Sequence, residues 1–253
     1  MIGVAARMPR PSPLGDEDIA GFYPFPDGDI GGGDAAAYQI EAVDRWLEQQ
    51  GTRFRDVATP IQPNIEWRAA SDFPADFVAA QARAADLAVI ASGHSRDDPY
   101  CSLEPGAALL NMGRPVLTIP PGVEALQAQR IVVAWKDARE ARRAVREALP
   151  LLRAAEAVFV IEAIDNEGSE SQAKERVDDT SAYLVRHRVT VAATFVERTE
   201  TTAAAQLIRA AQTRQADLIV AGAYGHSRLG EWIFGGVTRE LLTSSRMCCL
   251  FSH

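Results

Sequence analysis

The stretch ADLIVAGAYGHSR, residues 216–228, joins an apolar run to a glycine-rich end. The run ADLIVAGA is apolar almost throughout instead of alternating with polar residues, which is typical of a strand buried on both faces of a parallel sheet. Glycines continue to residue 236, and the residues that follow them are typical of a helix. A strand, a glycine-rich loop and a helix in this order favour an open α/β sheet that binds a ligand at its carboxyl edge.

The first half of the chain contains a near copy of this stretch, ADLAVIASGHSR at residues 85–96. The segments downstream also match, with GRPVLTIP at 113–120 corresponding to SRMCCLFS at 245–252. Such self-similarity at a nearly fixed separation indicates a duplicated domain. We therefore predict one domain over residues 1–122 and a second over residues 129–253, with the linker in PGVEALQAQ at 121–129.

The second half has the clearer alternation of strands and helices. Apolar, β-branched runs predict strands, and apolar residues at a spacing of three to four predict amphipathic helices. Strands are expected at 130–135, 157–164, 190–197, 216–223 and 247–252, and helices at 139–155, 171–187, 201–214 and about 235–245. This alternation predicts a doubly wound parallel sheet with helices on both faces.

The first half lacks the opening strand and helix of this pattern. IGVAA at 2–6 is its first expected strand, followed by a long helix from Asp34 through Gly51, a strand at 65–70 and a helix at 75–84. Because the first strand of a doubly wound sheet is central, its absence is expected to leave a gap instead of shortening an edge. We expect either that Met1 is an internal methionine of a chain longer by roughly 30 residues, or that another segment fills the gap.

The composition excludes several classes of partner. The net charge is −8, which argues against nucleic acid, because such binding depends on clustered Lys and Arg. No apolar run approaches about 18 residues and the N-terminus does not resemble a signal peptide, so we expect no membrane partner. Three cysteines, Cys101, Cys248 and Cys249, form no disulfide framework, and a cytoplasmic location is expected.

Catalytic and metal motifs are absent from the sequence pattern. His226 next to Ser227, and His94 next to Ser95, are interpreted as residues at strand ends, since neighbours in sequence rarely have triad geometry and no G-x-S-x-G elbow occurs. Adjacent residues of a strand point to opposite faces, so Cys248 and Cys249 are expected to be packed apolar residues rather than metal ligands. We predict no catalytic residues and no metal site.

With the repeat and the glycine spacing in view, the chain resembles the universal stress protein family, as a tandem pair with an incomplete first copy. The nucleotide-binding members of that family carry Gly, two residues, Gly, nine residues, Gly and then Ser or Thr. Here Gly222, Gly225 and Gly235 keep this spacing. The resemblance implies α/β domains with strand order 3-2-1-4-5 and pairing of the two copies through their last strands.

The resemblance also implies an adenine-nucleotide site, of the ATP type, in the second domain. Glycines let the backbone approach a phosphate closely, and the helix that follows offers free N–H groups to an anion. The residues expected at this site are Trp135, Lys136, Asp137, Ile164, Gly222, Gly225, His226, Arg228, Gly235, Gly236, Val237 and Thr238.

Three features differ from the family pattern. Gly236 stands at the Ser or Thr position, and Lys136 stands where the family has an aspartate, with Asp137 next to it. In the first copy, Gly93 has no second glycine at the required spacing, and Asp97 and Asp98 would repel phosphate. We therefore expect no nucleotide in the first copy.

These observations predict a stress-response sensor or regulator that binds an adenine nucleotide, and that has a regulatory protein and a second copy of itself as partners. The copy would pair through the apolar edge MCCLF at 247–251, unless VLTIP at 116–120 already covers it. The alternative is a stress-related interaction or dimerisation module that binds no nucleotide. An enzyme of phosphoryl or adenylyl transfer would need a carboxylate pair near Gly225, where the sequence offers only Glu231.

Overall fold

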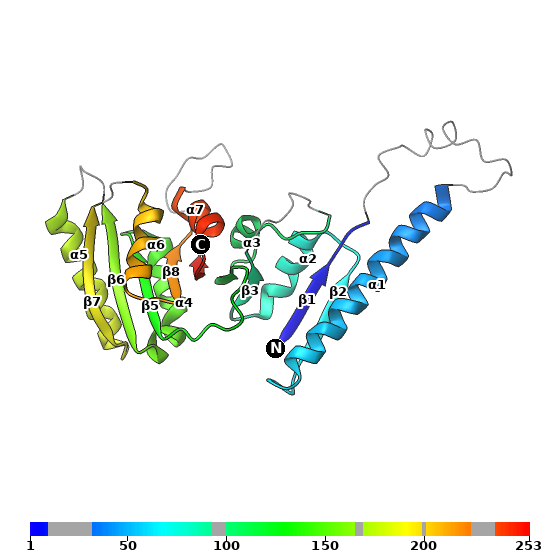
Figure 1. The fold of residues 1–253 in the computed structure, drawn as a ribbon, viewed down its shortest axis with the longest axis horizontal. Helices are drawn as coiled ribbons and strands as arrows, with labels where there is room; N and C mark the ends of the chain where they lie inside the picture. The colour runs from blue at the N-terminus through cyan, green and yellow to red at the C-terminus, as the bar shows by residue number, and fades with distance from the viewer. Residues whose placement is uncertain (10–31, 93–99, 165–168, 199–200, 224–235) are drawn as a thin grey trace. The chain divides into compact units, whose positions relative to one another are not determined.

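The structure, a computed structural model, forms two compact units that do not follow the sequence repeat (Figure 1). It describes residues 1–9, 32–92, 100–164, 169–198, 201–223 and 236–253. The first unit contains Met1–Gln81 and Ser95–Glu104, and the second contains Ala82–His94 and Pro105–His253. The predicted break between residues 122 and 129 therefore does not coincide with the division between the units.

A seven-stranded sheet forms the centre of the second unit. Its strands, in spatial order, are β3 (Ala88–Ala91), β4 (Val116–Ile119), β9 (Cys248–Ser252), β8 (Leu218–Gly222), β5 (Arg130–Trp135), β6 (Ala157–Ile164) and β7 (Val191–Arg198). All neighbours are parallel except β4 and β9. From β7 to β9 the order of the second copy is 3-2-1-4-5, which confirms the predicted topology.

Helices cover both faces of this sheet (Figure 1). They are α3 (Pro105–Asn111), α4 (Arg139–Ala154), α5 (Glu170–Arg186), α6 (Ala203–Thr213) and α7 (Gly236–Ser244), with a short 3₁₀ turn η2 (Ala82–Ala84) before β3. The apolar stripe of α4, including Val145 and Leu152, packs with α5 against Ile131 and Val133 of β5 in one buried cluster. Residues of opposite parity in the strands face α6 and α7, as the period of two in a strand requires.

The last strands of the two copies pair with each other, as the resemblance implied. Val116, Leu117 and Thr118 of β4 lie opposite Phe251, Leu250 and Cys249 of β9 in an antiparallel ladder. The buried Thr118 hydroxyl donates a hydrogen bond to the Cys249 carbonyl over 3.1 Å. This pairing draws β3, α3 and β4 into the second unit, and it covers the MCCLF edge within one chain.

The first unit contains a two-stranded parallel sheet, β1 (Ile2–Ala6) and β2 (Glu66–Ala70), with α1 (Gly32–Ala58) and α2 (Pro74–Gln81). Two glycines let α1 approach the sheet closely. A Cβ on Gly51 would lie 2.8 Å from Trp67 Nε1, and a Cβ on Gly3 would lie 2.8 Å from the Phe54 ring. A mid-helix glycine costs about 1 kcal/mol relative to alanine, and here it makes room for an indole ring.

The strands of the first copy are divided between two sheets. The pair β1–β2 corresponds to β6–β7 of the second copy, and β3–β4 corresponds to β8–β9. Among the strands that the structure describes, none takes the central place that β5 has in the second copy. The sheet of the first copy is thus interrupted at its centre, as the sequence predicted.

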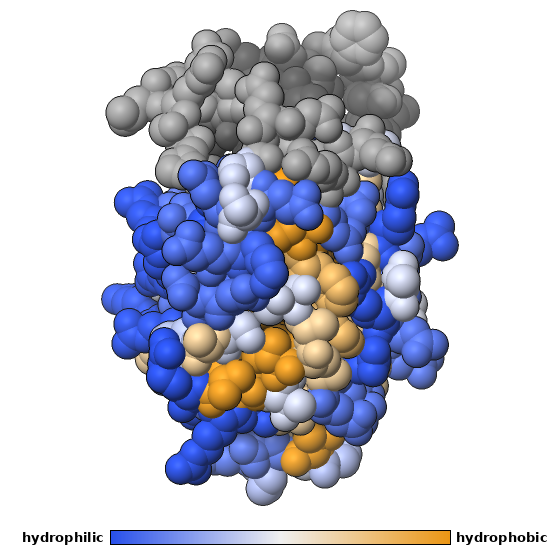
Figure 2. Space-filling model, turned by 90° about the vertical axis from the view of Figure 1, so that its left-hand side faces the viewer, coloured by the Kyte–Doolittle hydropathy of each residue, from blue (hydrophilic) through white to orange (hydrophobic). Residues whose placement is uncertain are grey.

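The outer face of the second unit at α5 and β7 carries a band of apolar surface between hydrophilic side chains (Figure 2). The band is expected from the sequence of β7, VAATFVER, because an edge strand is covered by a neighbour on one side only. Within the described ranges, none of the helices has both the length and the apolar character needed to cross a membrane.

Candidate functional site

The candidate site lies where the carboxyl ends of β5 and β8 meet. These two parallel strands are neighbours, but the chain leaves β5 toward β6 on one side and reaches β9 from β8 on the other. Ligands of open α/β sheets bind at such a point, because the connections diverge there and leave a crevice. A cavity of about 280 Å³ is present here, and its described walls come from β5, β6, β8 and the helices α4, α6 and α7.

Of the twelve residues that the sequence predicts for the site, six lie together in the wall of this cavity. They are Trp135, Lys136, Gly222, Gly236, Val237 and Thr238. Ile164, the last residue of β6, is buried with 5% of its surface exposed and does not line the cavity. Asp137 lies at a second cavity between α4 and α5, which Trp135 also lines. Gly225, His226, Arg228 and Gly235 lie outside the described residues.

Gly222 is required by packing between a helix and a strand. It is the last residue of β8 and pairs with Ser252, so it is part of the sheet and not of a turn. A Cβ at this position would lie 2.5 Å from the backbone nitrogen of Ala141 and 2.7 Å from the carbonyl carbon of Glu140. Only glycine lets the first turn of α4 come this close to β8, a reason that differs from the close approach to a phosphate expected from sequence.

Gly236 has different surroundings, although it lines the same cavity. It is exposed and opens α7, and an added Cβ would have no atom of the described residues within 4 Å. Thr238, in the first turn of the same helix, is only 3% exposed. Among the described residues, none would therefore clash with a side chain at position 236.

The first turn of α4 contributes a buried carboxylate, Glu140, which the sequence did not single out. Its residue exposure is 4%, and Arg139 Nε donates a hydrogen bond to it. Burial alone would raise the pKa of Glu140, but hydrogen bonds from Arg139 and from its own backbone N–H, with the charges of Arg139 and His253, lower that pKa below its usual value. Glu140 is therefore ionised at neutral pH.

A second buried carboxylate, Glu162 on β6, also lines the cavity. Arg176 of α5 holds it in a forked ion pair, with Nε 3.1 Å from both carboxylate oxygens. The hydrogen bond to Glu162 raises the pKa of Arg176, against the opposing effect of burial. A charged residue inside the apolar run AVFVIEAI is the sequence signal that could have indicated this pair, because an unpaired charge is too costly to bury in a strand.

Lys136 supplies the cation at the mouth of the cavity. Its side chain is exposed and makes no hydrogen bond or ion pair with the described residues. α4 begins nearby at Arg139, and the residue before it, Ala138, has an extended backbone and a methyl group that caps no N–H. The site thus combines two helix N-termini and an ammonium group without a partner among the described residues, which favour anions, with two carboxylates that already have arginine partners.

Cys248 and Cys249 are packed residues of β9, as the sequence predicted. Cys248 and Cys249 are both buried, and burial raises the pKa of the Cys249 thiol to about 12. A thiol with this pKa stays protonated at neutral pH and is a poor nucleophile or metal ligand. The two residues act as small apolar side chains of β9.

Comparison with known proteins identifies the family that the second domain matches. The model of the universal stress protein family matches residues 127–250. A universal stress protein from Archaeoglobus fulgidus DSM 4304 superposes with a TM-score of 0.60 at 13% identity, covering 83% of this chain and 81% of its own. A functionally unknown protein from Pseudomonas aeruginosa PAO1 gives a TM-score of 0.57 at 14% identity, covering 99% of this chain and 92% of its own.

At these identities the two structures are evidence for the fold alone, and each extends over both copies of the repeat. No curated protein sequence matches the chain. The family match spans the strands β5 and β8 and all described residues of the cavity between them. Residues 127–250 of this chain therefore belong to the universal stress protein family.

Proposed function

We propose that the chain binds an adenine nucleotide of the ATP type in the cavity between β5 and β8, and that this binding makes it a cytoplasmic sensor or regulator of the stress response. The observation that carries the proposal is the position of Lys136. This cation, which has no partner in the part of the chain that the structure describes, stands at the mouth of a cavity that the N-termini of α4 and α7 also border.

The parts of the site suit different parts of a nucleotide. The N-terminus of α7 and the Lys136 ammonium group favour the phosphates, because both present positive charge to an anion. The small side chains Ala134, Ala163 and Ala221 leave space for a flat base between the strand ends and α6. The proposal includes no catalytic step, and a regulatory protein and a second copy of the chain are its other partners.

An interaction module without nucleotide is the second candidate, and it too has a specific observation in its favour. Glu140 and Glu162 are buried carboxylates at the cavity wall, and negative charge there opposes phosphate. Gly236 also offers no hydroxyl group. In this case dimerisation or capture of a protein partner would be the activity.

Isothermal titration calorimetry with ATP separates the two candidates. We expect binding to the full chain, and Lys136→Gln is expected to weaken the affinity about tenfold, since a hydrogen bond to a charged group contributes about 1.5–3 kcal/mol. The matched control is Lys174→Gln, which removes the same charge from an exposed site on α5 where Lys174 pairs with Asp178. Absence of binding at millimolar ATP would favour the interaction module.

A further inference from the structure

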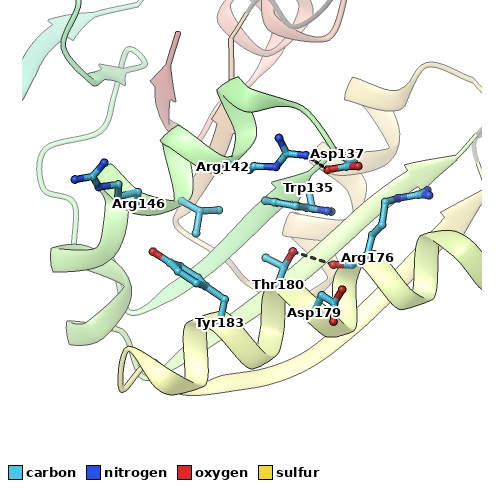
Figure 3. A pocket seen from close by; sticks show the side chains of 9 residues that line it. Trp135, Asp137, Arg142, Arg146, Arg176, Asp179, Thr180 and Tyr183 are labelled. Atoms are coloured by element: carbon cyan, nitrogen blue, oxygen red, sulfur yellow. Dashed lines mark hydrogen bonds and ion pairs between the residues drawn. The ribbon is translucent and has the colours of Figure 1, made fainter.

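The second unit contains another cavity, which the proposed function does not use. It has a volume of about 430 Å³ and lies between α4 and α5, beside the end of β5 (Figure 3). Small-molecule sites are typically cavities of about 300–1,000 Å³ with mostly apolar walls and a few placed polar groups. The residues that face this cavity fit that description.

The apolar walls are held in place by packing. Val145 of α4 is buried, and Trp135 and Tyr183 both pack against the buried cluster that includes it. The ring of Tyr183 also lies against the His187 ring in a tilted arrangement, with 4.4 Å between ring centroids. Thr180 of α5 is fixed by donating a hydrogen bond to the Arg176 carbonyl over 2.9 Å. Packing therefore holds two aromatic rings, those of Trp135 and Tyr183, at the wall of the cavity.

The charged residues at the rim leave one cation available. The lining contains three arginines and the two aspartates Asp137 and Asp179, so its formal charge is +1. Arg142 pairs with Asp137, and Arg176 pairs with Glu162. Arg146 is exposed and has no hydrogen bond or ion pair within the described part of the chain. Figure 3 shows Arg146 and the Tyr183 hydroxyl at the same end of the cavity.

From this geometry we infer that the cavity between α4 and α5 binds a small planar aromatic monoanion, such as an aromatic carboxylate. Trp135 and Tyr183 offer ring faces and edges for an aromatic body. The Arg146 guanidinium offers a charge-assisted, forked hydrogen bond to a carboxylate. Asp137 and Asp179 at the rim disfavour ligands with several negative charges, which separates this ligand from a nucleoside triphosphate.

Titration of the ¹⁵N-labelled full chain with 1-naphthoate tests this inference. Trp135 Nε1 is buried and has no hydrogen-bond partner among the described residues, so its indole N–H signal reports directly on changes around the ring. The signal is assigned by its loss in Trp135→Phe. We expect 1-naphthoate to shift this signal in a saturable way. The three control compounds 1-naphthalenemethanol, cyclohexanecarboxylate and inorganic phosphate are expected to bind at least about tenfold more weakly, because the first lacks the negative charge and the other two lack the aromatic ring.

Substitutions on one helix locate the binding. Arg146→Gln is expected to weaken 1-naphthoate about tenfold, whereas Arg143→Gln, which removes an exposed arginine of α4 outside the cavity, leaves the affinity unchanged. Lys136→Gln, at the other cavity, is also expected to leave it unchanged. The inference is overturned if the Trp135 signal does not respond, if the neutral naphthalene binds equally well, or if Arg146→Gln and Arg143→Gln have the same effect.

Discussion

At the level of single residues, the two described glycines of the site play different parts. Gly222 lies against the backbone of α4, where no side chain fits, whereas a Cβ on Gly236 would have no described atom within 4 Å. The sequence showed both only as members of one glycine pattern. It could not separate them, because the difference depends on how closely a helix and a strand distant in sequence approach each other.

Gly222→Ala is expected to destabilise the protein by about 1–3 kcal/mol, the usual cost of overpacking, because the backbone of α4 must move to admit the methyl group. Gly236→Ala is the matched control and is expected to stay within about 0.5 kcal/mol of the parent. Urea unfolding followed by circular dichroism measures both. Equal stability of Gly222→Ala and the parent would show that α4 does not approach β8 as described.

The Glu162–Arg176 pair provides a second test at this scale. Glu162→Gln leaves Arg176 without its partner, and we expect a loss of about 2 kcal/mol in the free energy of unfolding. This is less than the roughly 3–5 kcal/mol typical of fully buried pairs, because the Arg176 side chain keeps 32% exposure. A double-mutant cycle with Arg176→Gln isolates the pair, and additive single effects would contradict the coupling.

Glu140 makes the stability depend on pH in a defined direction. Its pKa is lower in the folded state than its ordinary value of 4.5, so its contribution is complete above that value and is lost as the pH falls through the folded-state pKa. Glu140→Gln should therefore be less stable than the parent at pH 7, and this difference should shrink below about pH 4. A difference that is constant between pH 7 and pH 3, in urea unfolding, would argue against an ionised Glu140.

At the level of elements, local pattern was sufficient for most helices and strands. The expected strand at 157–164 and the expected helix at 139–155 match β6 and α4 within one residue. The long helix α1 begins at Gly32, two residues before the expected Asp34. Glu140 and Glu162 were missed as site residues, since the burial of Glu140 and the pairing of Glu162 with Arg176 depend on how α4 and α5 pack against the sheet.

The pairing of β4 with β9 makes a prediction for hydrogen exchange. Because β9 has β8 on one side and β4 on the other, its amides should be protected to the same degree as those of the central strand β5. The edge strand β3 should exchange at least about tenfold faster. Mass spectrometry of peptides covering 247–253 and 130–135 gives the comparison, and fast exchange in the first peptide would contradict the pairing.

At the level of the whole molecule, the two units differ in how much sheet they contain. Among the residues that the structure describes, the first unit has two strands, whereas the second has seven. The repeat in the sequence predicted the interrupted sheet, but it did not predict that β3 and β4 fold with the second unit. That division follows from one antiparallel pairing between residues more than a hundred positions apart. A boundary placed from sequence periodicity does not take such a long-range pairing into account.

Unequal sheets should give unequal stabilities. Two-stranded sheets are marginal in water and depend on the helices packed on them, so β1 and β2 should lose exchange protection at a urea concentration about 1 M lower than β5 and β6, a gap that corresponds to about 1–3 kcal/mol. Exchange measured along a urea series resolves the two sets of peptides. A single common midpoint would mean that the chain unfolds as one cooperative body.

We propose that an adenine nucleotide occupies the cavity between β5 and β8. Photolabelling of the full chain with 8-azido-ATP, followed by peptide mapping, tests this proposal. We predict labelled peptides from the cavity wall, around residues 134–138 or 236–238, and loss of this label when unmodified ATP competes. Label that ATP does not displace, or label confined to the first unit, would contradict the claim.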